Sequence, residues 1–141
     1  MGSRPRVWLV DWAFAGIGDP AWDAGTIVHS SLLLWLHGIP FQREQSFADA
    51  LDDATLPLAT TRDFIRAFLS AYGEARRLRN LAARSFARRA FRYAGAALVQ
   101  SAVAAARLQE DLTPRQLAVM QMASHILDDP DDTLREFLDV E

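Results

Sequence analysis

Residues 7–23 read VWLVDWAFAGIGDPAWD, and the other elements of the chain follow this segment. Its first four residues are apolar and mostly β-branched or aromatic, which favours a short strand that ends at Asp11. A glycine-containing loop comes next. Asp19 and Pro20 then have the residue types of a helix start, an N-cap acid followed by proline. Asp23 follows one turn inside the predicted helix.

The predicted strand, residues 7–10, raises the question of what it pairs with. Residues 2–5, Gly-Ser-Arg-Pro, are typical of a hairpin tip, but no strand precedes them in the sequence. A lone strand cannot satisfy its own backbone N–H and C=O groups. We therefore expect the chain to begin in the middle of a fold, and we expect strand 7–10 to be available for self-association.

Composition indicates one soluble domain over residues 1–141, of which 50% are hydrophobic and 23% charged. The net charge is −3, so no general attraction to nucleic acid is expected. The chain has no cysteine, which excludes disulfides and thiolate metal sites and fits a cytoplasmic location. The longest runs without Asp, Glu, Lys or Arg are Ala24 to Gln42, of 19 residues, and Tyr93 to Ala106, of 14 residues. A membrane-spanning helix needs about 20, so we expect no membrane partner.

The pattern of apolar residues and caps predicts a mainly α-helical fold with one short N-terminal β-strand segment. Helices are expected over 20–37, 42–53, from Thr60 onward, 76–108, 114–127 and from Pro130 onward. Thr113 and Gln116 form a capping-box pattern, with proline between them at the first helical position. Asp129 has the residue type of an N-cap for the last helix.

The long predicted helix, 76–108, carries an apolar seam at spacings of three and four residues. Its second half is uncharged, which predicts a central position in a helical bundle. The seam residues are Ala82, Phe86, Ala90, Tyr93, Ala97, Ser101, Ala104 and Leu108. The corresponding faces of the earlier helices are Ala24, Ile27, Val28, Ser31, Leu32 and Trp35, and Phe64, Ile65, Phe68, Leu69 and Tyr72.

The opening segment resembles the part of aminoglycoside phosphotransferases and related small-molecule kinases that follows their catalytic loop. In that family a strand ends in Asp-Trp or Asp-Phe, and a Gly-Asp-Pro-x-x-Asp turn follows soon after. Here those pieces are Asp11-Trp12 and residues 18–23. The resemblance is strong over residues 6–24 and loose through the helices to about residue 108. It implies the C-terminal helical lobe of a protein-kinase-like fold.

The resemblance also implies roles for two carboxylates. Asp11 corresponds to the magnesium ligand that contacts the phosphates of ATP or GTP, and Asp23 to an aspartate that supports the catalytic loop. Asp19 is expected to be a structural cap from its residue type and position alone. The implied activity is transfer of the γ-phosphoryl group to a small-molecule hydroxyl, with unknown substrate-binding residues.

The sequence departs from the family pattern in two respects that bear on activity. It lacks the nucleotide-binding lobe, with its glycine-rich loop and lysine, and it lacks the catalytic loop. The family's catalytic loop, His-Gly-Asp with a following Asn, precedes the matching segment, whereas the His37-Gly38 pair of this chain comes after Asp11 and continues with Ile39. No catalytic residue is therefore assigned, and we expect the chain to be inactive alone.

Two alternatives stay open. One is a helical interaction module without catalysis. The other is weak nucleic-acid binding through the seven arginines between Arg76 and Arg92. Seven acids lie between Asp128 and Glu141, so an internal match of charge is the simpler account.

Overall fold

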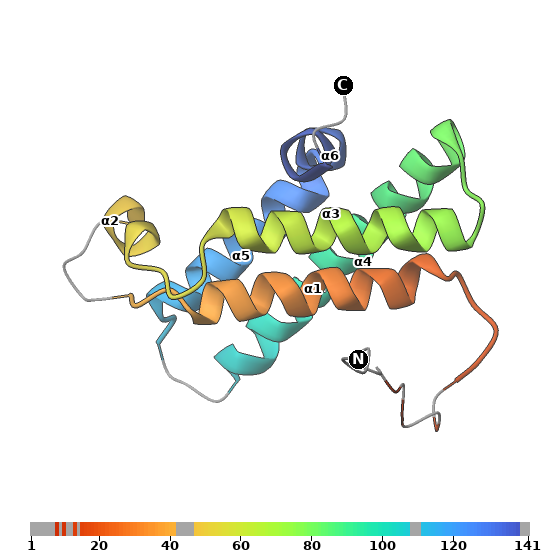
Figure 1. Cartoon of the computed structure of the whole chain (residues 1–141). Helices are drawn as coiled ribbons and strands as arrows, with labels where there is room; N and C mark the ends of the chain where they lie inside the picture. Colours follow the sequence, from red (N-terminus) through yellow and green to blue (C-terminus); the bar gives the residue numbers. More distant parts are fainter. Residues whose placement is uncertain are drawn as a thin grey trace.

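The protein is mainly α-helical in a computed structural model that describes residues 8, 10, 13, 15–41, 47–107 and 111–138. The described helices follow one another along a chain that folds back on itself repeatedly (Figure 1). They are α1 (Ala21–His37), α2 (Phe47–Asp52), α3 (Leu58–Ala75), α4 (Asn80–Ala106), α5 (Pro114–Asp128) and α6 (Pro130–Leu138).

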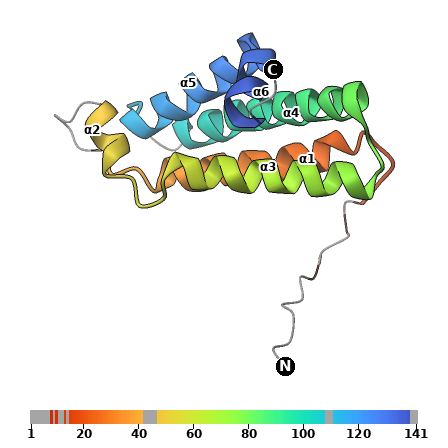
Figure 2. The same ribbon diagram turned by 45° about the horizontal axis from the view of Figure 1, so that its top comes forward.

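The helices form two layers (Figure 2). In this view α1 and α3 lie side by side in one layer, and α4 and α5 lie in the other, with α6 across them. The most extensive helix pairs are α1 with α4 and α4 with α5. Helix α4 also contacts α6, which confirms the central position predicted from its uncharged second half.

The core lies between α1, α3, α4, α5 and α6. Phe91 of α4 is fully buried and its ring centroid lies 5.5 Å from that of Phe137 on α6. Close packing of α1 on α4 depends on Gly25, because an added Cβ there would lie 2.7 Å from both the Ala90 carbonyl oxygen and Tyr93 Cβ. The core also includes Val28, Leu32, Leu36, Ile65, Leu98, Ile126 and Leu134.

Two predicted helix starts are wrong. Helix α3 begins at Leu58 rather than Thr60, with Pro57 as its N-cap in an extended conformation. Helix α4 begins at Asn80 rather than Arg76, because Arg77 and Asn80 have positive φ angles of 55° and 47°. These left-handed residues break the helical path and make residues 76–79 a turn between α3 and α4.

The N-caps of the last two helices, α5 and α6, agree with the sequence. The Thr113 side chain accepts a hydrogen bond from the Gln116 backbone N–H, and the Gln116 side chain accepts one from the Thr113 N–H. Both halves of the predicted capping box are thus present. Asp129 Oδ1 accepts a hydrogen bond from the Asp132 N–H, as its capping role predicts.

The predicted helix faces are partly wrong. Phe86 and Ala90 of the long seam are buried, whereas Ala82 and Ala104 are exposed and Leu108 lies outside the described residues. The buried stripe of α4 instead runs through Phe91, Ala94, Leu98 and Ala102. Ile27 and Phe64 are exposed as well. In α1, α3 and α4, the neighbouring helices therefore cover a narrower stripe than the apolar pattern of the sequence predicts.

The predicted strand is not found where the structure can test it. Trp8 and Val10 are described and are not in a strand, while Val7, Leu9 and Asp11 lie outside the described residues. Nothing else in the described part of the chain is a strand, so those two residues have no ladder to join.

Among the described helices, none is both long and apolar enough to cross a membrane.

Candidate functional site

The turn that opens α1 is built around Asp19. Its Oδ1 accepts a hydrogen bond from the Ala21 N–H at 3.0 Å, which satisfies one of the free donors at the helix start. The N-cap position itself is occupied by Pro20, whose ring provides no capping oxygen. Asp19 therefore holds the first turn of α1 from one residue further upstream than a standard N-cap.

The same carboxylate joins α1 to α4. Asp19 Oδ2 accepts a hydrogen bond from Arg89 Nε at 2.9 Å, and the Tyr93 hydroxyl lies 3.5 Å from it. Arg89 is itself positioned by hydrogen bonds from Nη1 to the Ser85 carbonyl and hydroxyl oxygens. The Trp22 ring meets the Tyr93 ring edge-on, with centroids 5.2 Å apart. Residues about 70 positions apart in sequence thus meet at this turn.

Hydrogen bonding stabilises the ionised form of Asp19. The Ala21 N–H contributes most and Arg89 next, and together they hold the pKa of the Asp19 carboxyl below its usual value of 3.8. The Asp19 side chain is 29% exposed, and its partial burial acts to raise the pKa, so the lowering comes from these donors. Asp19 remains a carboxylate across the physiological range.

The three carboxylates singled out by sequence have different surroundings. Asp11 lies outside the described residues, so its role as a metal ligand stays a prediction. Asp23 lies in the first turn of α1 with an exposed side chain. Among the contacts the structure describes, Asp19 and not Asp23 links α1 to another helix.

A pocket of about 360 Å³ lies beside this turn, where the start of α1 meets the end of α3 and the start of α4. Pro20 and Arg89 line it, together with Arg76 and Tyr72. The Tyr72 ring stacks on Phe86 with centroids 4.9 Å apart, which closes the apolar side of the pocket. The pocket lining therefore combines two guanidinium groups with an aromatic wall.

Arg89 was not singled out in the sequence, where it was one member of the run from Arg76 to Arg92. The run also pairs with the C-terminal acids: Arg84 and Arg88 lie 3.8 and 3.2 Å from the Asp131 carboxylate oxygens. The predicted internal match of charge is present at these residues. Such half-exposed pairs add little stability each, but they lower the positive charge available to nucleic acid.

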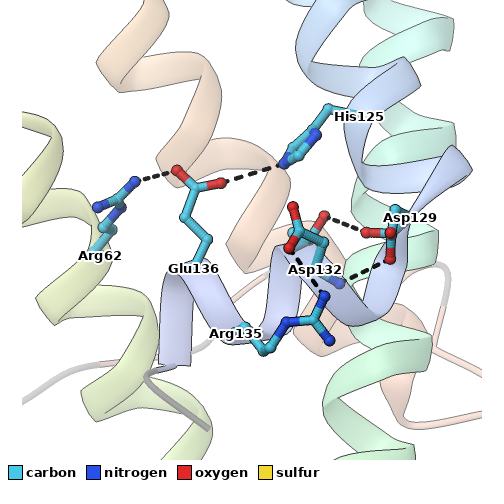
Figure 3. Close-up of polar contacts among 7 residues, drawn as sticks. Arg62, His125, Asp129, Asp132, Arg135 and Glu136 are labelled. Atoms are coloured by element: carbon cyan, nitrogen blue, oxygen red, sulfur yellow. Dashed lines mark hydrogen bonds and ion pairs between the residues drawn. The ribbon is translucent and has the colours of Figure 1, made fainter. Parts of the chain in front are cut away.

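The acidic helix α6 makes further polar contacts, shown in Figure 3. Glu136 forms an ion pair with Arg62 of α3 and lies 3.2 Å from His125 Nε2 of α5. Asp132 pairs with Arg135 within α6 at 3.0 Å. Glu136 therefore fixes α6 against two helices at once.

The histidines do not form a metal site. Burial lowers the pKa of His29, whose Nε2 lies 2.9 Å from the Ser101 hydroxyl oxygen. His37 Nδ1 donates to the Leu33 carbonyl oxygen at 2.8 Å. Among the described residues, no cluster of three or more His, Cys, Asp or Glu side chains could hold a metal ion.

Comparison with known proteins adds no relative. No protein-family model, no curated protein and no solved structure matches this chain.

Proposed function

We propose that this chain is the helical part of an ATP- or GTP-dependent phosphotransferase that acts on a small-molecule hydroxyl, similar to aminoglycoside phosphotransferases. In this proposal residues 7–23 follow the catalytic loop of the intact enzyme, and the helices after them carry the acceptor side of the site. The fold class assigned with it is the C-terminal lobe of a protein-kinase-like fold.

The observation that carries the proposal is the anchoring of the Gly-Asp-Pro-x-x-Asp turn. Asp19 binds the start of α1 and Arg89 of α4 at the same time. An acidic side chain that is stabilised only by the positive end of the helix dipole would need no such partner. The anchor holds the point from which the segment containing Asp11 leaves α1, and a metal ligand needs a fixed support of this kind.

The donor set is compatible with magnesium. Magnesium in phosphoryl-transfer sites is held by one or two carboxylates together with the substrate phosphates and water. Asp11 supplies a hard oxygen ligand of this type, so the absence of a three-residue cluster among the described residues is no objection. When bound, the metal and nucleotide supply the phosphoryl group and neutralise its charge. Asp23 supports the catalytic loop in this proposal.

Residues 1–141 should not catalyse the transfer alone. They contain no lysine to bind the nucleotide phosphates and no His-Gly-Asp segment to accept the proton of the substrate hydroxyl. Phosphoryl transfer depends on positioning and charge neutralisation, and these groups provide much of both.

The reading frame upstream of the Met1 codon tests the proposal. We expect an in-frame His-Gly-Asp segment with a following Asn. The extended protein should transfer the γ-phosphoryl group of ATP or GTP to small-molecule hydroxyls when magnesium is present. Asp11→Asn should lower kcat at least 100-fold, and Asp63→Asn, on an exposed position of α3, should leave it unchanged.

Either of two results would contradict the proposal. One is an upstream frame without the His-Gly-Asp segment. The other is an extended protein whose phosphoryl transfer Asp11→Asn leaves unchanged. Magnesium-dependent turnover by residues 1–141 alone would contradict only the expectation that this chain is inactive without the missing segment.

A further inference from the structure

A second pocket, of about 490 Å³, lies at the other end of α1, between the last turns of α1, the end of α4 and the start of α5. Its apolar walls are formed by Leu33, Phe41, Ala105 and Val119. This volume is within the range of small-molecule sites. A mainly apolar wall favours a ligand with an apolar body.

Gln116 is one of the residues that line this pocket, and its side-chain amide carries a buried donor that is not used. The side chain is only 6% exposed, and its Oε1 accepts the capping-box hydrogen bond from the Thr113 N–H at 2.6 Å. Because the Thr113 N–H can only donate, the capping box fixes which end of the amide is oxygen. The opposite end, Nε2, is buried and has no hydrogen-bond partner among the residues that the structure describes. A buried amide donor without a partner is costly, so a site that provides an acceptor there is favoured.

Arg115 adds a permanent positive charge beside it. The guanidinium Nη2 donates to the Ile39 carbonyl oxygen at 3.3 Å, which holds the side chain across the end of α1. Its Nε is also buried and has no partner within the described part of the chain. The described pocket lining includes no aspartate or glutamate. Two lining residues, Arg115 and Gln116, therefore carry unpartnered buried donors and one positive charge, without a compensating acid among the described lining residues.

We propose that this pocket binds a small organic carboxylate with an apolar body. The carboxylate accepts hydrogen bonds from the Arg115 guanidinium and from Gln116 Nε2, which the ligand reaches by displacing the atoms that now cover it. The body packs against Leu33, Phe41 and Val119. A carboxylate fits because it offers only acceptors, which these donors need, and because its charge complements that of Arg115. A neutral amide of the same shape satisfies the donors less well, and a cation is repelled.

This site is separate from the one proposed for phosphoryl transfer. Asp19 precedes the first turn of α1, whereas Leu33 and His37 are in its last turns. With a rise of 1.5 Å per residue, the two sites are roughly 20 Å apart along the helix. Failure of one proposal therefore leaves the other unaffected.

Benzoate tests the proposal with the full chain, and benzamide serves as the neutral molecule of matched shape. In a two-dimensional NMR titration at constant ionic strength, benzoate should shift the Gln116 side-chain amide and the backbone signals of residues 113–116, and the shifts should saturate. Benzamide should bind at least fivefold more weakly.

Gln116→Glu is the sharpest variant. Glutamate keeps the capping box, since its carboxylate still accepts from the Thr113 N–H, but it replaces the free donor by an acceptor and adds negative charge. Benzoate affinity should fall at least tenfold. Gln121→Glu makes the same charge change at an exposed position of α5 and should lower the affinity less than twofold. Arg115→Gln and Ala105→Phe, which remove the charge and narrow the pocket, provide a second measurement should Gln116→Glu fail to fold.

Three results would overturn the proposal. The first is benzoate shifts that do not saturate. The second is equal binding of benzoate and benzamide. The third is an affinity loss in Gln121→Glu as large as that in Gln116→Glu, or, if Gln116→Glu does not fold, unchanged benzoate affinity in both Arg115→Gln and Ala105→Phe.

Discussion

The Asp19 carboxylate makes stability depend on pH. The Ala21 N–H and Arg89 hold its pKa in the folded protein below 3.8, the value expected in the unfolded chain. A carboxyl whose pKa is lowered on folding contributes stability above the unfolded value and loses it as pH falls through the folded value. We expect Asp19→Asn to lower Tm at pH 7, and we expect the difference from the native chain to shrink below about pH 4. Thermal unfolding from pH 7 to 2.5 measures this.

Asp23→Asn provides the matched control, because Asp23 lies in the same first turn and no other helix contacts it through a described ion pair. Its Tm difference should be smaller than that of Asp19→Asn at pH 7. A carboxyl carbon NMR titration gives the Asp19 pKa directly. A folded pKa at or above 3.8 would show that Arg89 does not stabilise the ionised form.

Sequence analysis identified Asp19 but could not identify its partner. The capping role depends on Ala21, two residues away, and is a local signal. Arg89 is 70 residues away and is one of seven similar arginines. Only the packing of α1 on α4 selects it from the others. The orphan donor of Gln116 was missed for the same reason: the capping box was visible in the sequence, but the pocket on its other side was not.

At the level of the helices, ends were more predictable than faces. The capping box at Thr113 and the cap at Asp129 depend on neighbouring residues and were confirmed. The start of α4 was missed because a positive φ at Arg77 has no reliable residue signal. The predicted face of α4 differs from the buried face by a rotation about the helix axis. Nearly all residues from Tyr93 to Ala106 are small or apolar, so the sequence pattern does not single out one buried stripe.

Gly25 sets the distance between α1 and α4. In Gly25→Ala the new Cβ would lie 2.7 Å from the Ala90 carbonyl oxygen, and neither helix backbone can move aside alone. Overpacking costs about 1–3 kcal/mol, and the higher helix propensity of alanine offsets up to about 1 kcal/mol of this. We expect a net loss of about 1–2 kcal/mol in the free energy of unfolding, measured by urea denaturation.

Gly73→Ala in α3 is the control, because nothing lies within 4 Å of a Cβ added there. This variant gains the helix propensity without the clash and should be stabilised by up to about 1 kcal/mol. Equal effects of the two substitutions would mean that α1 and α4 are not in close contact at Gly25.

For the molecule as a whole, we propose self-association through the segment at residues 7–10. Trp8 and Val10 are 75% and 80% exposed, and Ile17 and Trp22 nearby are exposed too. Apolar surface of this kind is typical of interaction sites. Light scattering should show a mass that rises with concentration in the micromolar range, and Trp8→Ser with Val10→Ser should abolish the rise.

Leu81→Ser is the control, since Leu81 is as exposed as Val10 but lies on α4. It should not change the mass. A native chain that stays monomeric at high micromolar concentration would rule out the association and favour an isolated helical domain.

The pairing of α1 with α4 also has a consequence during synthesis. The contact between His29 and Ser101 joins residues 72 positions apart. At a translation rate of about 5–20 residues per second, α1 waits roughly 4–14 seconds before α4 is available to cover it. Val28, Leu32 and Leu36, which are fully buried in the finished fold, stay partly uncovered over that interval. The newly made chain therefore passes through a period in which apolar surface of α1 is uncovered, and the length of that period is set by the order of its helices along the sequence.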